Sequence, residues 1–342
     1  MRIIKILESL EGNKEYTGED VIADMYYQFR ITNLDKPIVI SFPVADSKKI
    51  YNPKVPIPTF NFISKYDVNV ISFGMIGSKK DNYFITPKFS DFIEELGELL
   101  KKFKIRLGYS NSQGGFGIGT YAKALNLDFV LLYYPVSTKK IDLVPWDTRL
   151  STKNVKHLHW LPPYNDVNLG DAKGYIIYDP LDDIDANHAK RFKGLKHIKV
   201  NGLVHGGGYN FLVKNSDVIQ DVARDFFYKQ ELDLPNFRLK VKKLRLSRTY
   251  YEGLLRKKPK NTILLKNQKK LLNNLDNILN KPSDSIIPDE VNLIRDSAIA
   301  LEAIDLKKSL ALMKLAHKLR PKGPVIMNKI TEYKKKLNKR IK

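Results

Sequence analysis

The chain has 342 residues, no cysteine and a formal net charge of +22. This length allows one large domain and a smaller one, and the lack of cysteine excludes disulfides, thiolate metal sites and a cysteine nucleophile. The excess positive charge favours an acidic partner such as nucleic acid, an anionic membrane surface or an acidic polysaccharide.

We expect neither a secretory leader nor a membrane span. The apolar start, residues 1–7, is short and is soon followed by Glu8, Glu11 and Lys14. No apolar run approaches the roughly 20 residues that cross a bilayer. The sequence therefore predicts a cytoplasmic protein. Its basic residues would also allow it to bind at the inner face of the membrane.

The first hundred residues alternate apolar runs typical of strands with a stretch typical of a helix. Residues 26–32, 37–42 and 68–73 predict three strands, and residues 48–58 predict a surface excursion. Residues 89–103 repeat apolar side chains at helical spacing, which predicts an amphipathic helix packed on a sheet.

The most informative stretch runs from residue 105 to residue 135. It contains a strand at 105–109, the pentapeptide SNSQG at 110–114, a helix from about 116 to 125 and a strand at 129–134. A serine between small residues at a sharp strand-to-helix turn is typical of a nucleophile elbow, and the lengths match a βαβ unit. The usual pattern has glycine where this chain has Ser110, so a glycine-rich turn without chemistry remains an alternative.

Ser112 is the candidate nucleophile of this turn. A tight turn needs small residues two positions before and after it, which here are Ser110 and Gly114. The N-terminus of the following helix would aim backbone N–H groups and a partial positive charge at an oxyanion. We expect the N–H of Gln113 to be one oxyanion donor. In an elbow enzyme the second comes from the loop after an early strand, here Val44 or Ala45.

Residues 136–173 lose periodicity and hold both tryptophans, Trp146 and Trp160. The sequence VPWDTR places an aromatic ring beside the charge pair Asp147 and Arg149, which suits a sugar or another polar substrate. We therefore predict a lid or pocket insertion in which Trp146, Asp147 and Arg149 bind substrate. The alternative is a packed surface loop held by an Asp–Arg pair.

The pattern of strands and helices then resumes. Residues 174–178 predict a strand that ends in an aspartate-rich loop, and residues 186–192 predict a short helix. Residues 197–204 predict another strand, followed by His205 and three glycines. Residues 213–228 predict an amphipathic helix that closes the domain.

Residues from about 37 to 228 resemble an α/β-hydrolase. The chain order of serine, acid and histidine, each after a successive strand, is the order of that superfamily. The segment IIYDPLDDIDANHAKRF (176–192) resembles its acid loop, with Asp182 in the acid position, and VNGLVHGGGYNFL (200–212) resembles its histidine loop. The resemblance implies a triad of Ser112, His205 and Asp182, with Asp179, Asp183 or Asp185 as alternatives for the acid. It also implies a mostly parallel sheet flanked by helices.

The C-terminal third has a different composition. We divide the chain into a catalytic domain at 1–230, a basic helical segment at 231–281 and a helical tail at 282–342. The basic segment can be a solvated face or a groove for a polyanion, and no nucleic-acid-binding module is recognised in it. The tail sequence ALEAIDLKKSLALMKLAHKLRPKGP (300–324) resembles one tetratricopeptide unit and would suit a protein or membrane partner.

An elbow domain followed by a basic helical tail also resembles O-acetyltransferases from bacterial capsule loci. This implies an esterase or an O-acyltransferase that acts on a carbohydrate or a capsule-type polysaccharide, neutral or anionic, with acyl-CoA as the donor in the case of transfer. No metal and no other cofactor is expected. The alternative is a non-catalytic polyanion-binding or scaffold protein on a hydrolase-like core.

Overall fold

In the computed structural model of this chain, the described residues are 2–10, 14–44, 55–76, 84–150, 160–203, 205, 216–241, 255, 259–263, 265, 288–302 and 305–339. The chain divides into two compact units. The first consists of Met1–Val200 with His205–Arg238, and the second of Asn201–Val204 with Leu239–Lys342.

The first unit is built on an eight-stranded sheet with the order β1-β2-β4-β3-β5-β6-β7-β8. Strands β1 and β2 pair antiparallel with each other and β2 with β4, whereas all pairs from β4 to β8 are parallel. This is the mostly parallel, α/β-hydrolase-like sheet that the sequence predicts. The strands are β1 (Tyr16–Ile22), β2 (Met25–Ile31), β3 (Ile38–Ser41), β4 (Asn69–Met75), β5 (Arg106–Asn111), β6 (Phe129–Tyr133), β7 (Lys173–Tyr178) and β8 (Lys196–Lys199).

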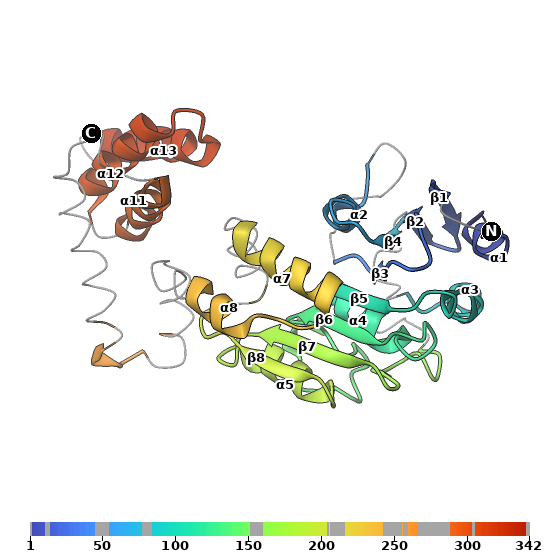
Figure 1. Cartoon of the computed structure of the whole chain (residues 1–342). Coiled ribbons are helices and arrows are strands. Elements are labelled where there is room, and N and C mark those ends of the chain that lie inside the picture. Colours follow the sequence, from blue (N-terminus) through green and yellow to red (C-terminus); the bar gives the residue numbers. More distant parts are fainter. Residues whose placement is uncertain are drawn as a thin grey trace. The chain divides into compact units, whose positions relative to one another are not determined.

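Helices cover both faces of this sheet (Figure 1). On one face, Tyr109 of β5 packs against Phe62 of α2 and Phe227 of α7, with ring centroids 5.9 and 5.3 Å away. On the other, Gly108 lies so close to α4 that an added Cβ would stand 2.7 Å from Ile118. The helices of this unit are α1 (Arg2–Glu8), α2 (Pro58–Ile63), α3 (Pro87–Leu100), α4 (Gln113–Tyr121), α5 (Asp183–Arg191), α7 (Ser216–Lys229) and α8 (Leu234–Val241).

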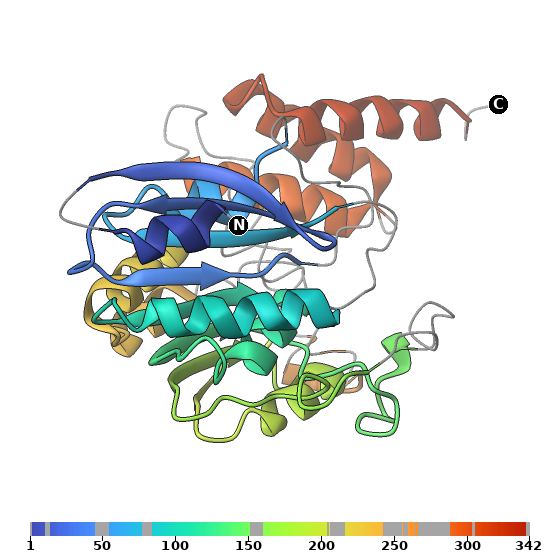
Figure 2. The same ribbon diagram turned by 90° about the vertical axis from the view of Figure 1, so that its right-hand side faces the viewer.

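A buried aromatic cluster fixes the end of β3 against the helices. The ring of Phe42, the residue after β3, lies 5.0 Å from Phe73 of β4 and 6.0 Å from Tyr121 of α4. Phe89 of α3 contacts the same ring edge-on at 6.2 Å. Figure 2 shows α1 (dark blue) in front of the N-terminal strands and α3 (teal) below them in this view. Because Phe42 leads into Pro43 and Val44, this cluster also positions the loop expected to help to form the oxyanion site.

Most of the predicted elements are confirmed, with three kinds of difference. The helix α1, the edge strand β1 and the short helix α2 were not predicted, because their sequences show no clear period. Helix α4 begins at Gln113, earlier than expected, since the elbow turns directly into it. Strand β8 ends at Lys199 rather than continuing to residue 204, and a turn with Gly202 at φ 79° follows. Most of the excursion at 48–58 lies outside the described residues.

The second unit contains three described helices with a core of their own: α11 (Pro288–Leu301), α12 (Leu306–Leu319) and α13 (Pro324–Lys339). The helical character predicted for the C-terminal tail is thereby confirmed, whereas the tetratricopeptide resemblance and the boundary at 281 stay predictions. Most of the basic segment at 231–281 lies outside the described residues. No helix in the described part of the chain combines the length and the apolar character that a membrane crossing requires. The core side chains include Ile294, Ala298, Leu312, Met313, Ala316 and Tyr333.

Candidate active site

Ser112 lies at a strained turn between β5 and α4. Its backbone has φ 50° and ψ −121°, a conformation that a non-glycine residue rarely adopts. The turn is held on both sides, because the Ser112 N–H donates to the carbonyl of Tyr133 at 3.0 Å and its carbonyl accepts from the N–H of Val136 at 2.9 Å. The geometry is that of a nucleophile elbow.

The small residues around Ser112 are required by contacts. A Cβ on Gly114 would lie 2.1 Å from the Ser110 hydroxyl and 2.3 Å from the carbonyl oxygen of Phe42. A Cβ on Gly115 would lie 2.3 Å from Pro135. The serine at position 110 fits because its hydroxyl donates a 2.8 Å hydrogen bond to the Phe42 carbonyl. The departure from glycine therefore adds a bond between the elbow and the end of β3.

Three side chains from different parts of the chain meet at the elbow. The Ser112 hydroxyl lies 3.1 Å from His205 Nε2, and His205 Nδ1 lies 2.8 Å from Asp185 Oδ1. The Asp185 side chain is 1% exposed and that of His205 is 28% exposed. His205 follows β8, Asp185 lies on α5 after β7, and the Tyr134 ring packs edge-on against the imidazole at 4.9 Å.

The carboxylate at His205 belongs to Asp185 and not to Asp182. Asp182 is the N-cap of α5, and its Oδ1 accepts from the N–H groups of Ile184 and Asp185, each at 3.1 Å. Asp179 is also used locally, since its Oδ1 accepts from the N–H of Leu181 at 2.9 Å. The spacing Asp-x-x-Asp at 182–185 is close to a capping box. That signal indicates that the first aspartate caps the helix and that the second lies one turn inside it.

The two expected oxyanion donors lie on either side of the elbow. Gln113 opens α4, where backbone N–H groups have no acceptor within the helix. Its side chain is 1% exposed, and neither amide atom has a hydrogen-bond partner among the described residues. Val44 lies two residues after Phe42, whose carbonyl is bound to the elbow, and Ala45 lies outside the described residues. The oxyanion roles of Gln113 and Val44 stay predictions.

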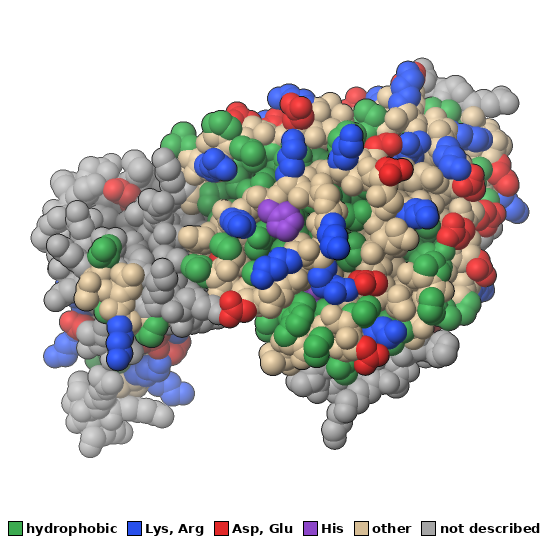
Figure 3. Space-filling model, turned by 90° about the horizontal axis from the view of Figure 1, so that it is seen from below, with side chains coloured by type: hydrophobic (Ala, Val, Ile, Leu, Met, Phe, Trp, Pro, Cys, Tyr) green, Lys and Arg blue, Asp and Glu red, His purple; other side chains and the backbone are tan. Residues whose placement is uncertain are grey.

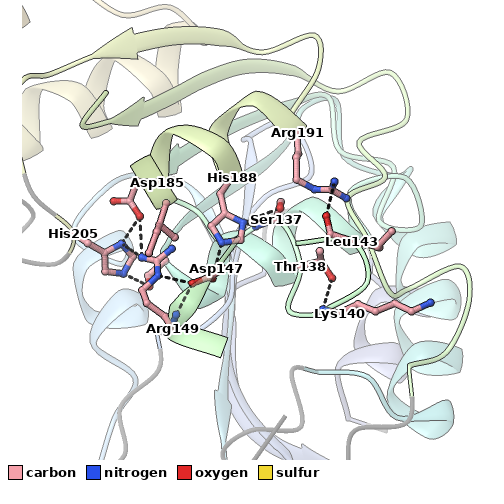
Figure 4. Close-up of polar contacts among 12 residues, drawn as sticks. Ser137, Thr138, Lys140, Leu143, Asp147, Arg149, Asp185, His188, Arg191 and His205 are labelled. Atoms are coloured by element: carbon pink, nitrogen blue, oxygen red, sulfur yellow. Dashed lines mark hydrogen bonds and ion pairs between the residues drawn. The ribbon is translucent and has the colours of Figure 1, made fainter. Parts of the chain in front are cut away.

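Two of the three residues expected to bind substrate, Asp147 and Arg149, form hydrogen bonds with other side chains of the protein (Figure 4). Arg149 Nη1 lies 2.9 Å from Asp185 Oδ1 and 3.0 Å from His205 Nδ1. Arg149 Nε and its backbone N–H both donate to Asp147 Oδ1, at 3.2 and 2.9 Å. The other Asp147 oxygen lies 2.9 Å from His188 Nε2. The sequence pattern indicated the Asp–Arg pair but gave no sign of its contact with the acid and the histidine.

The buried neighbours of this pair complete the network. Ser137 contacts His188 Nδ1 through its backbone N–H at 3.1 Å and through its hydroxyl at 2.9 Å. The Trp146 ring packs against His188 at 4.7 Å and is half-buried. Because the Ser137 N–H donates to Nδ1, the proton of neutral His188 lies on Nε2 and is donated to Asp147.

Electrostatics give this network definite protonation states. Burial by itself raises the pKa of the Asp147 carboxyl, but the hydrogen bond from His188 and the charge of Arg149 outweigh it and lower the pKa to about 2. Burial lowers the pKa of His188 from 6.5, and its bond to Asp147 offsets only part of that effect. Near neutral pH Asp147 is therefore ionised and His188 is neutral. No group of three His, Asp or Glu side chains in the described part of the chain could hold a metal ion.

Comparison with known proteins gives only distant similarities. No protein-family model and no curated protein matches the sequence. Among solved structures, the capsule O-acetyltransferase of Neisseria meningitidis serogroup A is 13% identical, with a TM-score of 0.42 over 63% of this chain and 97% of the other. The carboxylesterase EstE1 from a metagenomic library is 14% identical, with a TM-score of 0.41 over 66% and 92%. Carboxyl esterase 2 of Tuber melanosporum is 13% identical, with a TM-score of 0.40 over 65% and 88%.

Proposed function

We propose that this chain is a serine-dependent acyl-transfer enzyme that works through an acyl-Ser112 intermediate. The observation that carries the proposal is the chain of contacts from the Ser112 hydroxyl through His205 to Asp185 at a strained elbow. Serine, histidine and aspartate in this arrangement are the parts that nucleophilic acyl transfer needs. The acid of the triad is then Asp185, one of the alternatives that the sequence left open.

The geometry supports the following steps. Ser112 Oγ attacks the acyl carbonyl while His205 Nε2 takes its proton, and Asp185 stabilises the imidazolium through Nδ1. The N–H groups of Gln113 and Val44 would bind the oxyanion, and loss of one such donor typically raises the barrier by about 3–4 kcal/mol. The imidazolium then protonates the leaving group as the tetrahedral intermediate collapses to the acyl-serine.

The second half of the reaction decides between an esterase and an O-acyltransferase. In both, His205 takes a proton from the attacking O–H, which belongs to water in an esterase and to a sugar in a transferase. Trp146, half-buried beside the network, supports a carbohydrate acceptor because aromatic rings pack on sugar faces. The resemblance to capsule O-acetyltransferases adds acyl-CoA as the donor. The basic C-terminal residues would suit an anionic polymer.

A fluorophosphonate probe tests the proposal without knowledge of the substrate, because an activated serine forms a bond to phosphorus and releases fluoride. We expect the wild type to be labelled and Ser112→Ala, His205→Ala and Asp185→Asn to lose labelling while remaining folded by circular dichroism. Asp182→Asn is the matched control, which should keep both the cap of α5 and the labelling because asparagine caps a helix about as well as aspartate. A folded wild type that does not react, or a Ser112→Ala variant that still does, would overturn the proposal.

Hydrolysis and transfer can then be separated by product. The wild-type protein, not treated with the probe, is incubated with an acyl-CoA, with and without neutral and anionic oligosaccharides, and acylated sugar and free acid are measured by mass spectrometry. Acylated sugar that depends on Ser112 supports the transferase, whereas free acid formed at the same rate with and without sugar supports the esterase.

A further inference from the structure

Arg149 makes contacts that a serine–histidine–aspartate triad does not require. Its Nη1 lies within 3.0 Å of both Asp185 Oδ1 and His205 Nδ1, and these two atoms are themselves 2.8 Å apart. Its guanidinium therefore touches the acid–histidine pair at the oxygen through which the two are joined. The side chain is 30% exposed, whereas Asp185 is 1% exposed.

We propose that Arg149 is a positioning residue that holds the Asp185 carboxylate toward His205, and that Asp147 and His188 hold Arg149 in turn. This inference rests on the proposed acyl-transfer function. It assigns to the Asp147–Arg149 pair a role in setting the triad rather than direct binding of substrate.

The chemistry of the three touching atoms supports this role. A carboxylate oxygen accepts hydrogen bonds and a guanidinium only donates them. Asp185 Oδ1 can thus accept from Arg149 Nη1 and from a protonated His205 Nδ1 together, and the 3.0 Å contact between Nη1 and Nδ1 is then a contact of two donors that share this acceptor, not a hydrogen bond. With Nδ1 protonated, Nε2 is free to accept the Ser112 proton, which is the tautomer that the reaction needs. Arg149 thereby pins the oxygen that selects this tautomer.

Arg149 is itself fixed by a buried chain of partners (Figure 4). Asp147 binds the guanidinium at Nε and also accepts the Arg149 backbone N–H, so both ends of the side chain are restrained. His188 binds the other Asp147 oxygen. His188 is itself bound by the backbone N–H of Ser137, which follows β6 in the chain. These links join the 136–173 insertion to α5.

The charge of Asp147 explains why Arg149 does not remove the negative charge next to His205. Arg149 alone would neutralise Asp185 and remove the negative charge that stabilises the imidazolium. Asp147 is ionised and bound to the same guanidinium, and buried His188 is neutral, so the group of Asp147, Arg149 and Asp185 keeps one net negative charge. Asp147 therefore affects His205 without touching it.

The second-order rate constant for fluorophosphonate labelling of the full chain tests this inference. We expect Arg149→Met to lower it by about 100-fold, the scale of small displacements in a catalytic group, and Arg149→Lys by about 10-fold. Arg191→Met is the matched control. Arg191 is 27% exposed, bridges Asp166 at 2.6 Å and binds the Leu143 carbonyl of the same insertion, without touching the triad. The labelling rate constant of Arg191→Met should stay within about twofold of that of the wild type.

Two further measurements remain informative if Arg149→Met folds poorly. Guanidinium ion at tens of millimolar, far below denaturing concentrations, should accelerate labelling of Arg149→Ala at least several-fold and leave the wild type unchanged. Tetramethylammonium, a cation that cannot donate hydrogen bonds, should not. Asp147→Asn, which leaves Arg149 unbalanced, should slow labelling by about 10-fold with less effect on thermal stability than on rate.

The outcomes separate the two proposals. Loss of labelling in the Arg149 and Asp147 variants, with guanidinium rescue and an unaffected Arg191→Met, supports the positioning role. Folded Arg149 variants that label at the wild-type rate, or a parallel loss in Arg149 and Arg191 variants without rescue, would overturn it while the proposed function stands. A wild type that is not labelled would overturn both.

Discussion

At the scale of single residues, Ser110 departs from the usual elbow motif and adds a hydrogen bond to the fold. Ser110 replaces a glycine at a crowded position, yet its hydroxyl finds the Phe42 carbonyl at 2.8 Å and is 1% exposed. Strand β3 ends one residue earlier, at Ser41, so this bond continues the link between β3 and β5 beyond the ladder. It ties the oxyanion loop to the elbow that carries the nucleophile.

Ser110→Ala should therefore affect both stability and reactivity. It leaves the buried Phe42 carbonyl without this donor, so we expect a loss of about 1 kcal/mol in the free energy of unfolding by urea. We also expect fluorophosphonate labelling to slow by about 10-fold, because the loop that supplies an oxyanion donor loosens.

Ser72→Ala provides the comparison for this prediction. Ser72 is fully buried on β4 and its hydroxyl lies 2.7 Å from that of Ser41, the residue before Phe42. It should lose similar stability without slowed labelling. Equal labelling rates for Ser110→Ala and the wild type would show that the hydrogen bond from Ser110 to the Phe42 carbonyl contributes to stability alone.

At the scale of elements, helix α5 and its N-cap residue combine three roles. Asp182 caps it, Asp185 faces His205, and His188 lies three residues further along and binds Asp147. Residues three apart share a helix face, so the acid and the buried histidine both point toward the 136–173 insertion. The same helix thus carries the proposed acid and anchors the side chains that hold it.

The sequence allowed the order of these elements to be predicted, but not the contacts between them. Period and turn signals indicated β2 to β8, α3 to α5 and α7, and the elbow singled out Ser112. The choice between Asp182 and Asp185 depends on which carboxylate caps the helix, and the local Asp-x-x-Asp spacing carries a signal for it. The position of Arg149 depends instead on the tertiary structure of a loop without periodicity. The antiparallel edge strand β1 escaped detection because its residues are mostly half-exposed and polar.

His188 should make the stability of the sheet unit depend on pH. Burial lowers its pKa in the folded state from 6.5, so the unfolded chain binds the proton more tightly. The stability that neutral His188 contributes is complete above pH 6.5 and is lost as the pH falls through 6.5 toward the folded pKa. One such group gives a slope of at most about 1.4 kcal/mol per pH unit.

Urea unfolding of the wild type and His188→Gln between pH 8 and pH 5 measures this slope, and the variant should show a flatter dependence. His197→Gln is the comparison, since burial also lowers the pKa of His197 but this residue lies on the edge strand. A His188→Gln curve parallel to that of the wild type would assign the slope to other groups.

At the scale of the whole molecule, charge is divided unevenly along the chain. Residues 239–342 hold 27 of the 59 lysines and arginines but only 9 of the 37 acidic residues, which leaves +18 of the +22 net charge there. The remainder, with the complete proposed triad, is close to balanced at +4. Figure 3 shows acidic side chains interspersed among the basic ones on the face it draws. Attraction of a polyanion and acyl transfer would therefore reside in different parts of the sequence.

This division predicts that binding and chemistry can be separated. The full chain should bind heparin, a generic anionic polysaccharide, with an affinity that falls steeply as salt rises, because charge attraction is screened. A chain ending at residue 238 should bind weakly with little salt dependence, yet label with fluorophosphonate within about twofold of the full chain if it melts cooperatively. Because the shortened chain keeps Ser112, Asp185 and His205, unchanged salt dependence would place polyanion binding on the sheet unit. A loss of labelling in a folded shortened chain would show instead that the C-terminal residues take part in forming the site.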